Sequence, residues 1–234
     1  MKIFACDSTA KTASVALCED KILLAEFTQN GGNTHSETLL PMTEVLLNSM
    51  KTDIDEIDVF AISEGPGSFT GVRIGAATVK GFAHRKNKPC IGVSTLEALA
   101  RNLAFGEDKI IIPVMDARRG QFYTAKFALR DGKIERVSED TPMSFEEFLE
   151  DVKALGEHVY LCGDGYAPAR KLLGDELSFE TPEKLRYQSA YSVAQIAYEK
   201  YQAGVRTSAE ELRPTYLRLP QAERDRLNKE KLKG

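Results

Sequence analysis

Three short segments of the sequence carry residue types that can bind phosphate or a divalent cation. The first is Asp7-Ser8-Thr9, which directly follows an apolar run. Backbone N–H groups and hydroxyls at such a turn can hold a phosphate, and a carboxylate can hold Mg²⁺ through water. An Asx residue at a turn can also serve only to cap it. The residues alone leave both roles open for Asp7.

The second segment, Glu64–Ser68, contains two glycines and is expected between a buried strand and a helix. Glycine accepts positive φ angles, and consecutive N–H groups at the start of a helix form a nest for an anion. We therefore predict that the two turns together are the remnant of a phosphate or nucleotide site. Its candidate residues are Asp7, Ser8, Thr9, Gly65, Gly67 and Ser68.

The third segment, Asp116–Gly120, occupies the matching turn in the second half of the chain. Here Arg118 and Arg119 stand where a phosphate loop needs small residues for close backbone approach. An arginine side chain can still bind an anion, so we expect these two to contact carboxylates of a partner or phosphates of RNA. Their bulk argues against ATP hydrolysis by the chain alone. A nucleotide-dependent kinase or ATPase that uses Asp7 and the glycine loop is the alternative.

The helix expected after the glycine loop, over residues 71–85, is rich in small residues. A glycine inside a helix costs about 1 kcal/mol relative to alanine, so these residues indicate close approach of another backbone. Packing within this chain is one explanation, but a helix that is apolar on most sides favours an interface. We expect a bulky residue at Gly75 or Ala76 to leave the fold intact and to abolish binding of a partner. The candidate interface residues are His35, Leu39, Leu40, Thr70, Gly71, Val72, Arg73, Gly75, Ala76 and Val79.

The sequence shows no pattern of metal ligands or nucleophiles. His35, His84 and His158 are scattered, and the residue four positions after His35 is Leu39. The four cysteines lie far apart, whereas zinc sites use close pairs. No G-x-S-x-G motif occurs either. We predict buried free thiols, no metal and no catalytic residue; a metallopeptidase is the alternative that metal analysis of the protein would decide.

The composition is that of a globular protein, with 42% hydrophobic and 28% charged residues among 234. Its formal charge of −4 argues against broad, independent binding to nucleic acid, which needs a basic surface. No apolar run approaches the roughly 18 residues that cross a bilayer. The first apolar run, residues 3–6, has no basic region before it and predicts a strand instead of a signal peptide. We expect a cytoplasmic protein without membrane contact.

The order of expected elements is similar in both halves of the chain. In the first half we expect strands over 2–7, 13–18 and 22–28, a helix over 36–50, a strand over 57–63, the glycine loop with its helix, a strand over 89–93 and a helix over 95–103. The second half repeats three strands, a helix and a strand with a glycine loop, and a helix near 192–202 is expected to complete its lobe. The polar residues 221–234 are expected to form a frayed helix.

Two βββαβα halves, each opening with a hairpin that bears an aspartate, predict an α/β protein of actin/Hsp70/sugar-kinase-like ATPase fold. We expect one lobe over residues 1–106, with the partner-binding helices, and a second over 107–234. A Rossmann fold would place a G-x-G-x-x-G loop and a helix straight after the first strand. Here that strand turns into a hairpin, which disfavours the Rossmann alternative.

Several segments together resemble the bacterial TsaB (YeaZ) family, the small paralogue of the Gcp/TsaD family. They include HSETLLP, GPGSFTGVRIG, GVSTLEALA, PVMDARRG and PTYLR, and they follow one another in the family's order over most of the chain. The resemblance implies an actin-like ATPase fold and a part in making threonylcarbamoyladenosine beside the anticodon of tRNA. The family also carries an older label, M22-type glycoprotease, but this sequence lacks the metal-ligand residues that such an enzyme needs.

The resemblance also implies partners. In that family the large paralogue TsaD carries the metal and transfers threonylcarbamoyl from its adenylate to adenosine, and an ATPase, TsaE, joins the assembly. The small paralogue dimerises with TsaD through its first two helices. This sequence fits the non-catalytic role because it lacks the H-x-x-x-H pair of TsaD. We expect contact with tRNA through the complex, a homodimer when the chain is alone, and no tightly bound cofactor, with ATP or ADP only in the complex.

Overall fold

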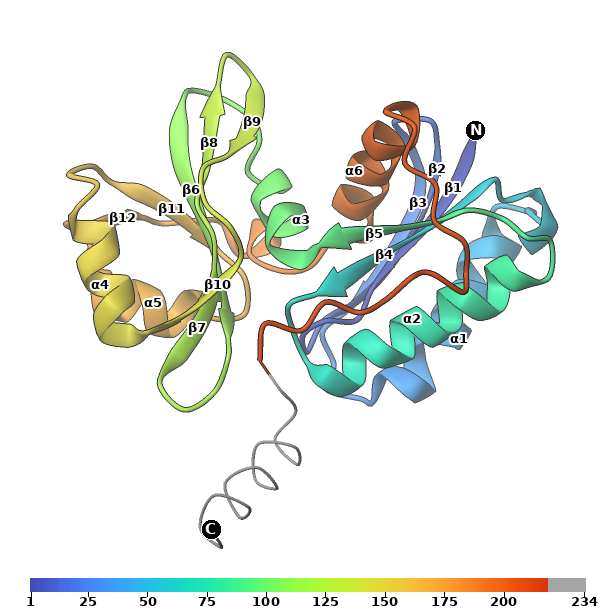
Figure 1. Cartoon of the computed structure of the whole chain (residues 1–234), viewed down its shortest axis with the longest axis horizontal. Coiled ribbons are helices and arrows are strands. Elements are labelled where there is room, and N and C mark those ends of the chain that lie inside the picture. The colour runs from blue at the N-terminus through green and yellow to red at the C-terminus, as the bar shows by residue number, and fades with distance from the viewer. Residues whose placement is uncertain (219–234) are drawn as a thin grey trace, which may run out of the picture.

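The computed structural model describes residues 1–218 and consists of two lobes, each built around one β-sheet with helices packed on it (Figure 1). The helix expected over residues 221–234 lies outside the described residues. No helix within residues 1–218 is long and apolar enough to cross a membrane.

The first half of the chain follows the expected order, and its elements begin and end within two residues of the expected positions. They are β1 (Lys2–Asp7), β2 (Ala13–Glu19), β3 (Ile22–Gln29), α1 (His35–Ser49), the 3-10 helix η1 (Ile54–Glu56), β4 (Val59–Gly65), α2 (Phe69–His84), β5 (Cys90–Ser94) and α3 (Thr95–Arg101). Pro41 lies in the second turn of α1, where its missing N–H removes the hydrogen bond that the helix would otherwise make to the Glu37 carbonyl.

The second half contains elements that the sequence analysis did not anticipate, namely α5, β12 and two broken strands. Its elements are β6 (Lys109–Asp116), β7 (Gln121–Thr124), β8 (Phe127–Arg130), β9 (Lys133–Arg136), β10 (Thr141–Ser144), α4 (Phe145–Lys153), β11 (Val159–Cys162), α5 (Tyr166–Leu173), β12 (Ser178–Phe179), η2 (Glu183–Leu185) and α6 (Ala190–Gln202).

The strand order is equivalent in the two sheets. The first sheet runs β3-β2-β1-β4-β5, and the second runs β10-β7-β6-β11-β12, with β8 on β6 and β9 on β8. β7 and β8 pair with successive stretches of β6, residues 114–116 and 109–111, so together they take the place that β2 has in the first sheet. β9 and β10 take the place of β3 in the same way. The predicted actin/Hsp70/sugar-kinase-like fold with two βββαβα halves is confirmed.

Both faces of the first sheet are buried at its inner strands β2, β1 and β4. In β1, Ile3 and Ala5 pack in the cluster that includes α6, whereas Phe4 and Cys6 pack in the cluster that includes α1 and α2. Successive side chains of a strand point to opposite faces, so a strand covered on both sides must be apolar at nearly every position. This requirement explains the continuous apolar run at the start of the chain. The four cysteines are buried and free, as expected.

The last helix of each half packs across the boundary between the halves. α3 packs on β6 of the second sheet, through Leu96, Leu99 and Leu103. α6, which the sequence analysis expected to complete the second lobe, instead packs on β1, β2, β4 and β5 of the first sheet. Small residues of α6, among them Ala194 and Ala197, allow this close approach. The two helices also contact each other between the lobes (Figure 1).

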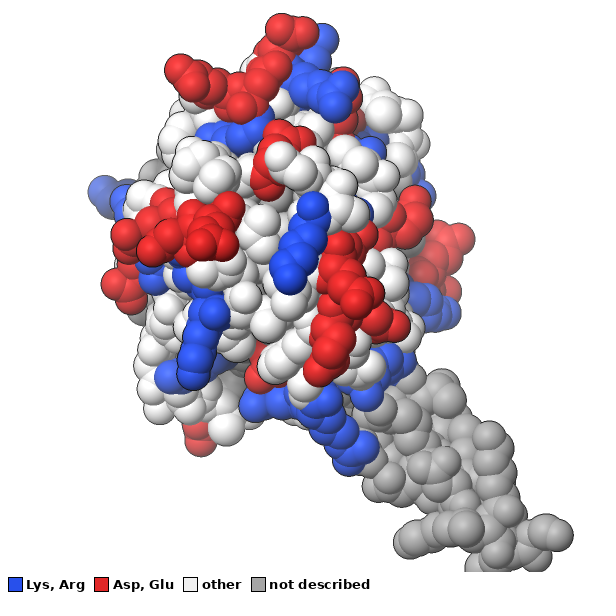
Figure 2. All heavy atoms as spheres, turned by 90° about the vertical axis from the view of Figure 1, so that its left-hand side faces the viewer, with Lys and Arg blue, Asp and Glu red and all other residues white. Residues whose placement is uncertain are grey.

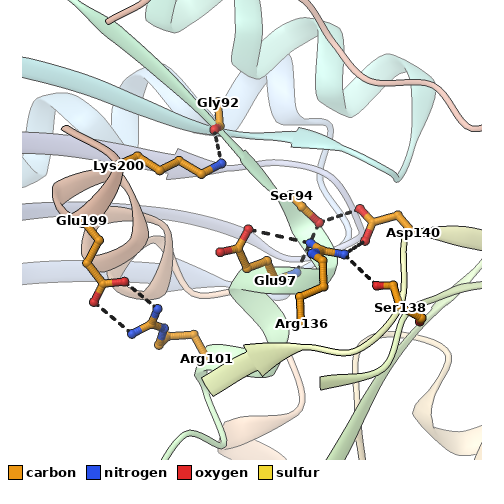
Figure 3. A network of polar contacts seen from close by, with 9 residues as sticks. All are labelled: Gly92, Ser94, Glu97, Arg101, Arg136, Ser138, Asp140, Glu199 and Lys200. Carbon is orange, nitrogen blue, oxygen red and sulfur yellow. Dashed lines mark hydrogen bonds and ion pairs between the residues drawn. The ribbon is translucent and has the colours of Figure 1, made fainter. Parts of the chain in front are cut away.

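A polar network adds to this junction (Figure 3). Arg101 of α3 forms a two-pronged ion pair with Glu199 of α6. Ser94, at the end of β5, donates a hydrogen bond of 2.6 Å to Asp140, which also pairs with Arg136 of β9. The network therefore joins the end of the first sheet to the β9–β10 segment of the second lobe.

The chain after α6 returns to the first lobe. Thr207 forms a β-bridge with Cys90 of β5, and Leu212 is buried between the sheet and helices α1 and α2. The Thr215 N–H then donates to the Glu64 carbonyl at 2.7 Å, at the end of β4. Residues 205–218 thus form a strap along the first lobe that ends beside the glycine loop (Figure 1).

Candidate functional site

A cleft of about 610 Å³ lies between the lobes where the three predicted segments meet. Thr9, Gly67 and Ser68 line it from the first lobe, and Arg118 and Arg119 line it from the second. These residues come from three turns that are each at least 50 positions apart in the chain. Their convergence follows from the equivalent topology of the halves, which brings the first hairpin turn of each lobe to the same cleft.

Asp7 lies behind the surface of this cleft and is fully buried. One carboxylate oxygen accepts hydrogen bonds from the backbone N–H of Thr9 at 2.9 Å and from its hydroxyl at 2.7 Å, and the other accepts from the Ser63 hydroxyl. Burial raises the pKa of Asp7, and these hydrogen bonds oppose that rise. The bonds to Thr9 are those of an Asx residue that caps its own turn. The structure therefore shows the capping role, while a role toward Mg²⁺ stays a prediction.

The glycine loop packs directly on this turn. The Ser68 N–H, at the start of α2, donates to the Thr9 carbonyl at 2.6 Å. The Gly71 N–H donates to the Ser68 hydroxyl at 3.3 Å, which makes Ser68 the N-cap of α2. A Cβ at Gly67 would overlap the Thr9 carbonyl. Two N–H groups that could form an anion nest are thus already bonded within the chain.

The strap covers the other side of the loop. Gly65 has φ of +122°, and a Cβ there would overlap the carbonyl oxygen of Thr215. Beside it, the rings of Phe69 and Tyr216 lie 4.8 Å apart. The Arg73 guanidinium lies 3.7 Å from the centre of the Phe69 ring, and its Nε donates to the Tyr216 hydroxyl at 3.0 Å. The first turn of α2 is therefore held against the chain's own C-terminal strap.

The arginine turn on the opposite wall has an uncommon backbone. Arg118 and Arg119 have φ of +64° and +58°, and Gly120 follows with +72°. Side chains other than glycine rarely adopt this region, and such residues often mark functional turns. Asp116 stabilises the turn by accepting from the Arg118 N–H at 2.8 Å. The Arg118 side chain is 86% exposed, and its guanidinium lies 3.5 Å from the Asp116 carboxylate, so an anion that binds Arg118 would compete with this exposed ion pair.

Asp164 is a residue of this cleft that the sequence analysis missed. It lies between Gly163 and Gly165 after β11, and it accepts a hydrogen bond of 3.1 Å from the Asp116 N–H. Burial raises its pKa to about 6, and the nearby Asp116 carboxylate acts in the same direction. The signal was the internal repeat: Gly163, with φ of +102°, directly follows β11, and Gly65, with φ of +122°, is the last residue of β4. A carboxyl that titrates near neutral pH in a cleft is a candidate functional group.

The candidate interface on α1 and α2 is divided between core and surface. The buried members are Leu39, Gly71, Val72, Gly75, Ala76 and Val79, and the exposed members are Leu40, Thr70 and Arg73. His35 is half-buried, with Nε2 at 2.6 Å from the Ala10 carbonyl. Leu39, Val79 and Val72 are at most 1% exposed, so in this structure they fill the core and do not face a partner.

The small residues of α2 serve internal packing. A Cβ at Gly75 would lie 2.5 Å from the Ser8 hydroxyl and 2.9 Å from Cδ1 of Ile62. A Cβ at Gly71 would overlap the Ser8 carbonyl, and the Ser8 hydroxyl donates to the Gly71 carbonyl at 2.9 Å. The expectation that a bulky residue at Gly75 leaves the fold intact is therefore wrong, because this glycine lets α2 approach the first hairpin turn.

The helices nonetheless leave an apolar surface uncovered. Leu40 and Val45 of α1 are 52% and 53% exposed. On α2, residues spaced three or four positions apart are also exposed, as expected for the solvent side of a helix. We call this set the α1/α2 outer surface; it comprises Leu40, Val45, Thr70, Arg73, Ala77 and Gly81. Val45 was missed because its side chain falls outside the stripe that includes Leu39 and Leu46.

The face of the second lobe seen in Figure 2 carries charges of both signs. Viewed from the side of that lobe, acidic and basic side chains alternate over the described surface (Figure 2). Such a surface gives no extended basic platform for nucleic acid on this face.

Among residues 1–218, no group of three or more histidine, cysteine, aspartate or glutamate side chains is arranged to hold a metal ion.

Two equivalent βββαβα lobes, with their first hairpin turns facing one cleft, define a protein of the actin/Hsp70/sugar-kinase-like ATPase fold. A family model described as TsaD, tRNA N6-adenosine threonylcarbamoyltransferase, matches residues 23–225. The tRNA threonylcarbamoyladenosine biosynthesis protein TsaB of Bacillus subtilis is 31% identical over 95% of this chain and 96% of its own. The Escherichia coli protein of the same name is 30% identical over 93% and 95%. The chain belongs to the TsaB (YeaZ) family.

A solved structure, YeaZ from Pseudomonas aeruginosa, superposes with a TM-score of 0.79 over 92% of this chain and 99% of its own. Its sequence identity is 24%, so this similarity bears on the fold. The arrangement of two lobes is therefore shared with a protein of the same family.

Proposed function

We propose that this chain is a non-catalytic accessory subunit in the threonylcarbamoyladenosine modification of tRNA beside the anticodon. It dimerises with a catalytic paralogue, TsaD, and activates it, while TsaD transfers threonylcarbamoyl from its adenylate to adenosine. The names of the Bacillus subtilis and Escherichia coli relatives support a part in this biosynthesis. The ATPase TsaE is the further proposed partner, and tRNA is reached through the complex.

The accessory role is supported chiefly by how the candidate phosphate-binding residues of the cleft are already bonded within the chain. Asp7 is buried and bonded on both carboxylate oxygens, and the glycine loop uses N–H groups for Thr9 and for its own cap. Arg118 and Arg119 occupy the opposite turn. Groups that an ATPase needs for phosphate and Mg²⁺ thus stabilise the chain's own structure. ATP or ADP, if required, is proposed to bind only in the complex.

The α1/α2 outer surface is the proposed contact with TsaD. It places two half-exposed aliphatic side chains, Leu40 and Val45, on one helix beside another helix with exposed small residues. Exposed apolar side chains at a helix pair favour burial against further helices. Without TsaD, the same surface would pair with a second copy, because a two-fold dimer buries the patch on both chains.

The decisive experiment is reconstitution of tRNA modification by TsaD and TsaE with and without this chain, with modified adenosine measured by nucleoside mass spectrometry. We expect modification only when the chain is present. Val45→Arg should abolish it and weaken binding of TsaD at least tenfold, whereas the control Val137→Arg, at a position 57% exposed on the second lobe, should change neither. Full modification without the chain would refute the accessory role.

The autonomous kinase or ATPase remains the second candidate, because the predicted phosphate residues do meet in one cleft. It requires measurable ATP turnover by the purified chain that is lost in Asp7→Ala. Thermal unfolding of the variant must accompany this assay, since Asp7 also stabilises its turn. A third role, direct contact of Arg118 and Arg119 with tRNA, would appear as binding by the isolated chain that weakens steeply with salt.

A further inference from the structure

A second and larger cleft, of about 1140 Å³, shares no lining residue with the cleft that holds the arginine turn. Its walls come from β3, the end of α3, the β8–β9 turn and the segment that joins η2 to α6. Both lobes therefore contribute to it. Its volume exceeds what a small organic ligand needs.

Gln188 lines this cleft with an unpaired amide. Its side chain is 2% exposed, and neither Nε2 nor Oε1 has a hydrogen-bond partner among the described residues. Nε of Arg101, another lining residue, is also buried without a partner within residues 1–218. A buried amide without partners is unfavourable. Two unpaired polar side chains in one cleft, the Gln188 amide and the Arg101 Nε–H, indicate a binding site. The bound molecule would accept hydrogen bonds from Nε2 of Gln188 and Nε of Arg101 and would donate one to Oε1 of Gln188.

The segment around Gln188 is held in place by residues of the first half of the chain. Asn102, which directly follows α3, donates to the carbonyls of Leu185 and Tyr187, at 3.3 and 2.7 Å. Ser189 donates to Glu26 of the first sheet at 2.8 Å. Because the residues on both sides are fixed, the Gln188 amide is presented in a preformed position, which lowers the entropic cost of binding a ligand.

The charged side chains of this cleft leave an excess of positive charge. Glu199 is paired with Arg101 and Lys21 (Figure 3 shows the arginine pair). Two further lining residues, Lys133 and Lys184, take part in no ion pair within the part of the chain that the structure describes. A ligand that meets them should carry an anionic group.

We propose that this cleft binds a nucleoside phosphate, with the phosphate near Lys133 and Lys184 and an edge of the base on the Gln188 amide. An amide side chain offers a donor and an acceptor side by side, the pattern with which glutamine pairs to the edge of adenine. The nucleotide can be free or part of an RNA strand, since both present the same base edge and phosphate. The site is separate from the α1/α2 outer surface and does not depend on the proposed accessory role.

Isothermal titration calorimetry on the full chain tests this proposal with four probes: AMP, adenosine, ribose 5-phosphate and a short single-stranded oligoadenylate. We expect AMP to bind at least tenfold more tightly than adenosine or ribose 5-phosphate, because each of these lacks one of the two recognised groups. Tighter binding of the oligoadenylate than of AMP would support RNA as the source of the nucleotide. Tighter binding of AMP than of the oligoadenylate would support a free nucleotide. Absence of binding by both AMP and oligoadenylate would overturn the proposal.

Variants locate the site. Gln188→Leu should weaken AMP binding about tenfold, whereas the control Gln195→Leu, on α6 in the same cleft, should leave it within twofold. Lys184→Ala changes an exposed residue of η2. It should weaken AMP binding and leave thermal unfolding unchanged. This variant therefore tests the site even if Gln188→Leu fails to fold. AMP binding that is unaffected by both Gln188→Leu and Lys184→Ala would overturn the assignment to this cleft.

Discussion

Gly75 of α2 lies so close to Ser8 of the first hairpin turn that a Cβ would stand 2.5 Å from the serine hydroxyl. Four residues earlier, Gly71 meets the same serine through its backbone and accepts its hydroxyl hydrogen bond. The helix and the turn are therefore fitted to each other. This contact fixes the start of α2, and with it the position of the α1/α2 outer surface.

Replacement of Gly75 by leucine should destabilise the protein itself. The new side chain meets Ser8 and Ile62 in a closed space, and overpacking of this kind costs roughly 1–3 kcal/mol. Gly81→Leu is the matched control, because no atom lies within 4 Å of a Cβ at that position. Urea unfolding should show a loss for Gly75→Leu and an unchanged or higher stability for Gly81→Leu, because leucine favours a helix more than glycine does. Equal stability of the two variants would contradict the packing described here.

Removal of the Asp7 carboxylate should also reduce stability. Asp7→Ala leaves Ser63 and the Thr9 N–H without their acceptor in a buried place, which costs roughly 1–3 kcal/mol. The control, Ser36→Ala, removes an exposed hydroxyl in the first turn of α1 and should have a small effect. The measurement is the free energy of unfolding by urea at neutral pH. An unchanged value for Asp7→Ala would count against the capping role.

Asp164 should make stability depend on pH. Its folded-state pKa of about 6 lies above the ordinary value of 3.8, so the folded protein binds the proton more tightly than the unfolded chain does. The stability that this group contributes is present at low pH and is lost as pH rises from about 4 through 6. Asp164→Asn should remove that loss and gain roughly 1–3 kcal/mol at pH 7.

Unfolding in urea between pH 4 and 7 measures this effect. The difference in stability between Asp164→Asn and the natural chain should grow with pH and level off above about 6. Asp131→Asn, at an exposed turn between β8 and β9, is the control and should show no such trend. A difference that is constant across the range would show that Asp164 does not titrate there.

The ion pair between Arg101 and Glu199 should give a modest coupling across the lobe junction. Both charges are partly exposed, with side-chain exposures of 19% and 40%, so solvent screens them. A double-mutant cycle with Arg101→Met and Glu199→Gln should yield about 0.5–1 kcal/mol at low salt and less at 1 M salt. A coupling near zero at low salt would mean that apolar packing alone joins α3 to α6.

The sequence predicted the fold well because its signals were local and repeated. The apolar run before Asp7 and the glycine loop before α2 each indicate one element, and the repetition of the element order in the second half indicates the topology. The second lobe was harder because Ala125 and Lys126 interrupt a predicted strand. On the two sides of this break the strand has different partners, β10 beside β7 and β9 beside β8, and this pairing leaves no local signal in the sequence.

The predicted site was less complete for the same reason. The sequence identified the turns that meet in the 610 Å³ cleft, but it could not say which face of α2 is buried. Small residues at helical spacing allow close packing either against a helix of a partner or against a turn of the same chain. The position of Ser8 next to Gly71 and Gly75 shows that the turn is the neighbour here. Asp164 and Gln188 were missed because their surroundings come from segments far apart in the chain.

The exchange of α3 and α6 between the lobes has a consequence for synthesis of the chain. The first sheet is complete once β5 has been made, but the helix that covers one of its faces ends at Gln202. At ribosomal rates of elongation, α6 is completed about 5–20 s after β5. Until then, this face of the sheet has no helix packed on it. During that interval the nascent first lobe exposes the apolar residues that later contact α6. A chaperone that binds short apolar strands would find its target there, in a lobe whose sheet is already complete.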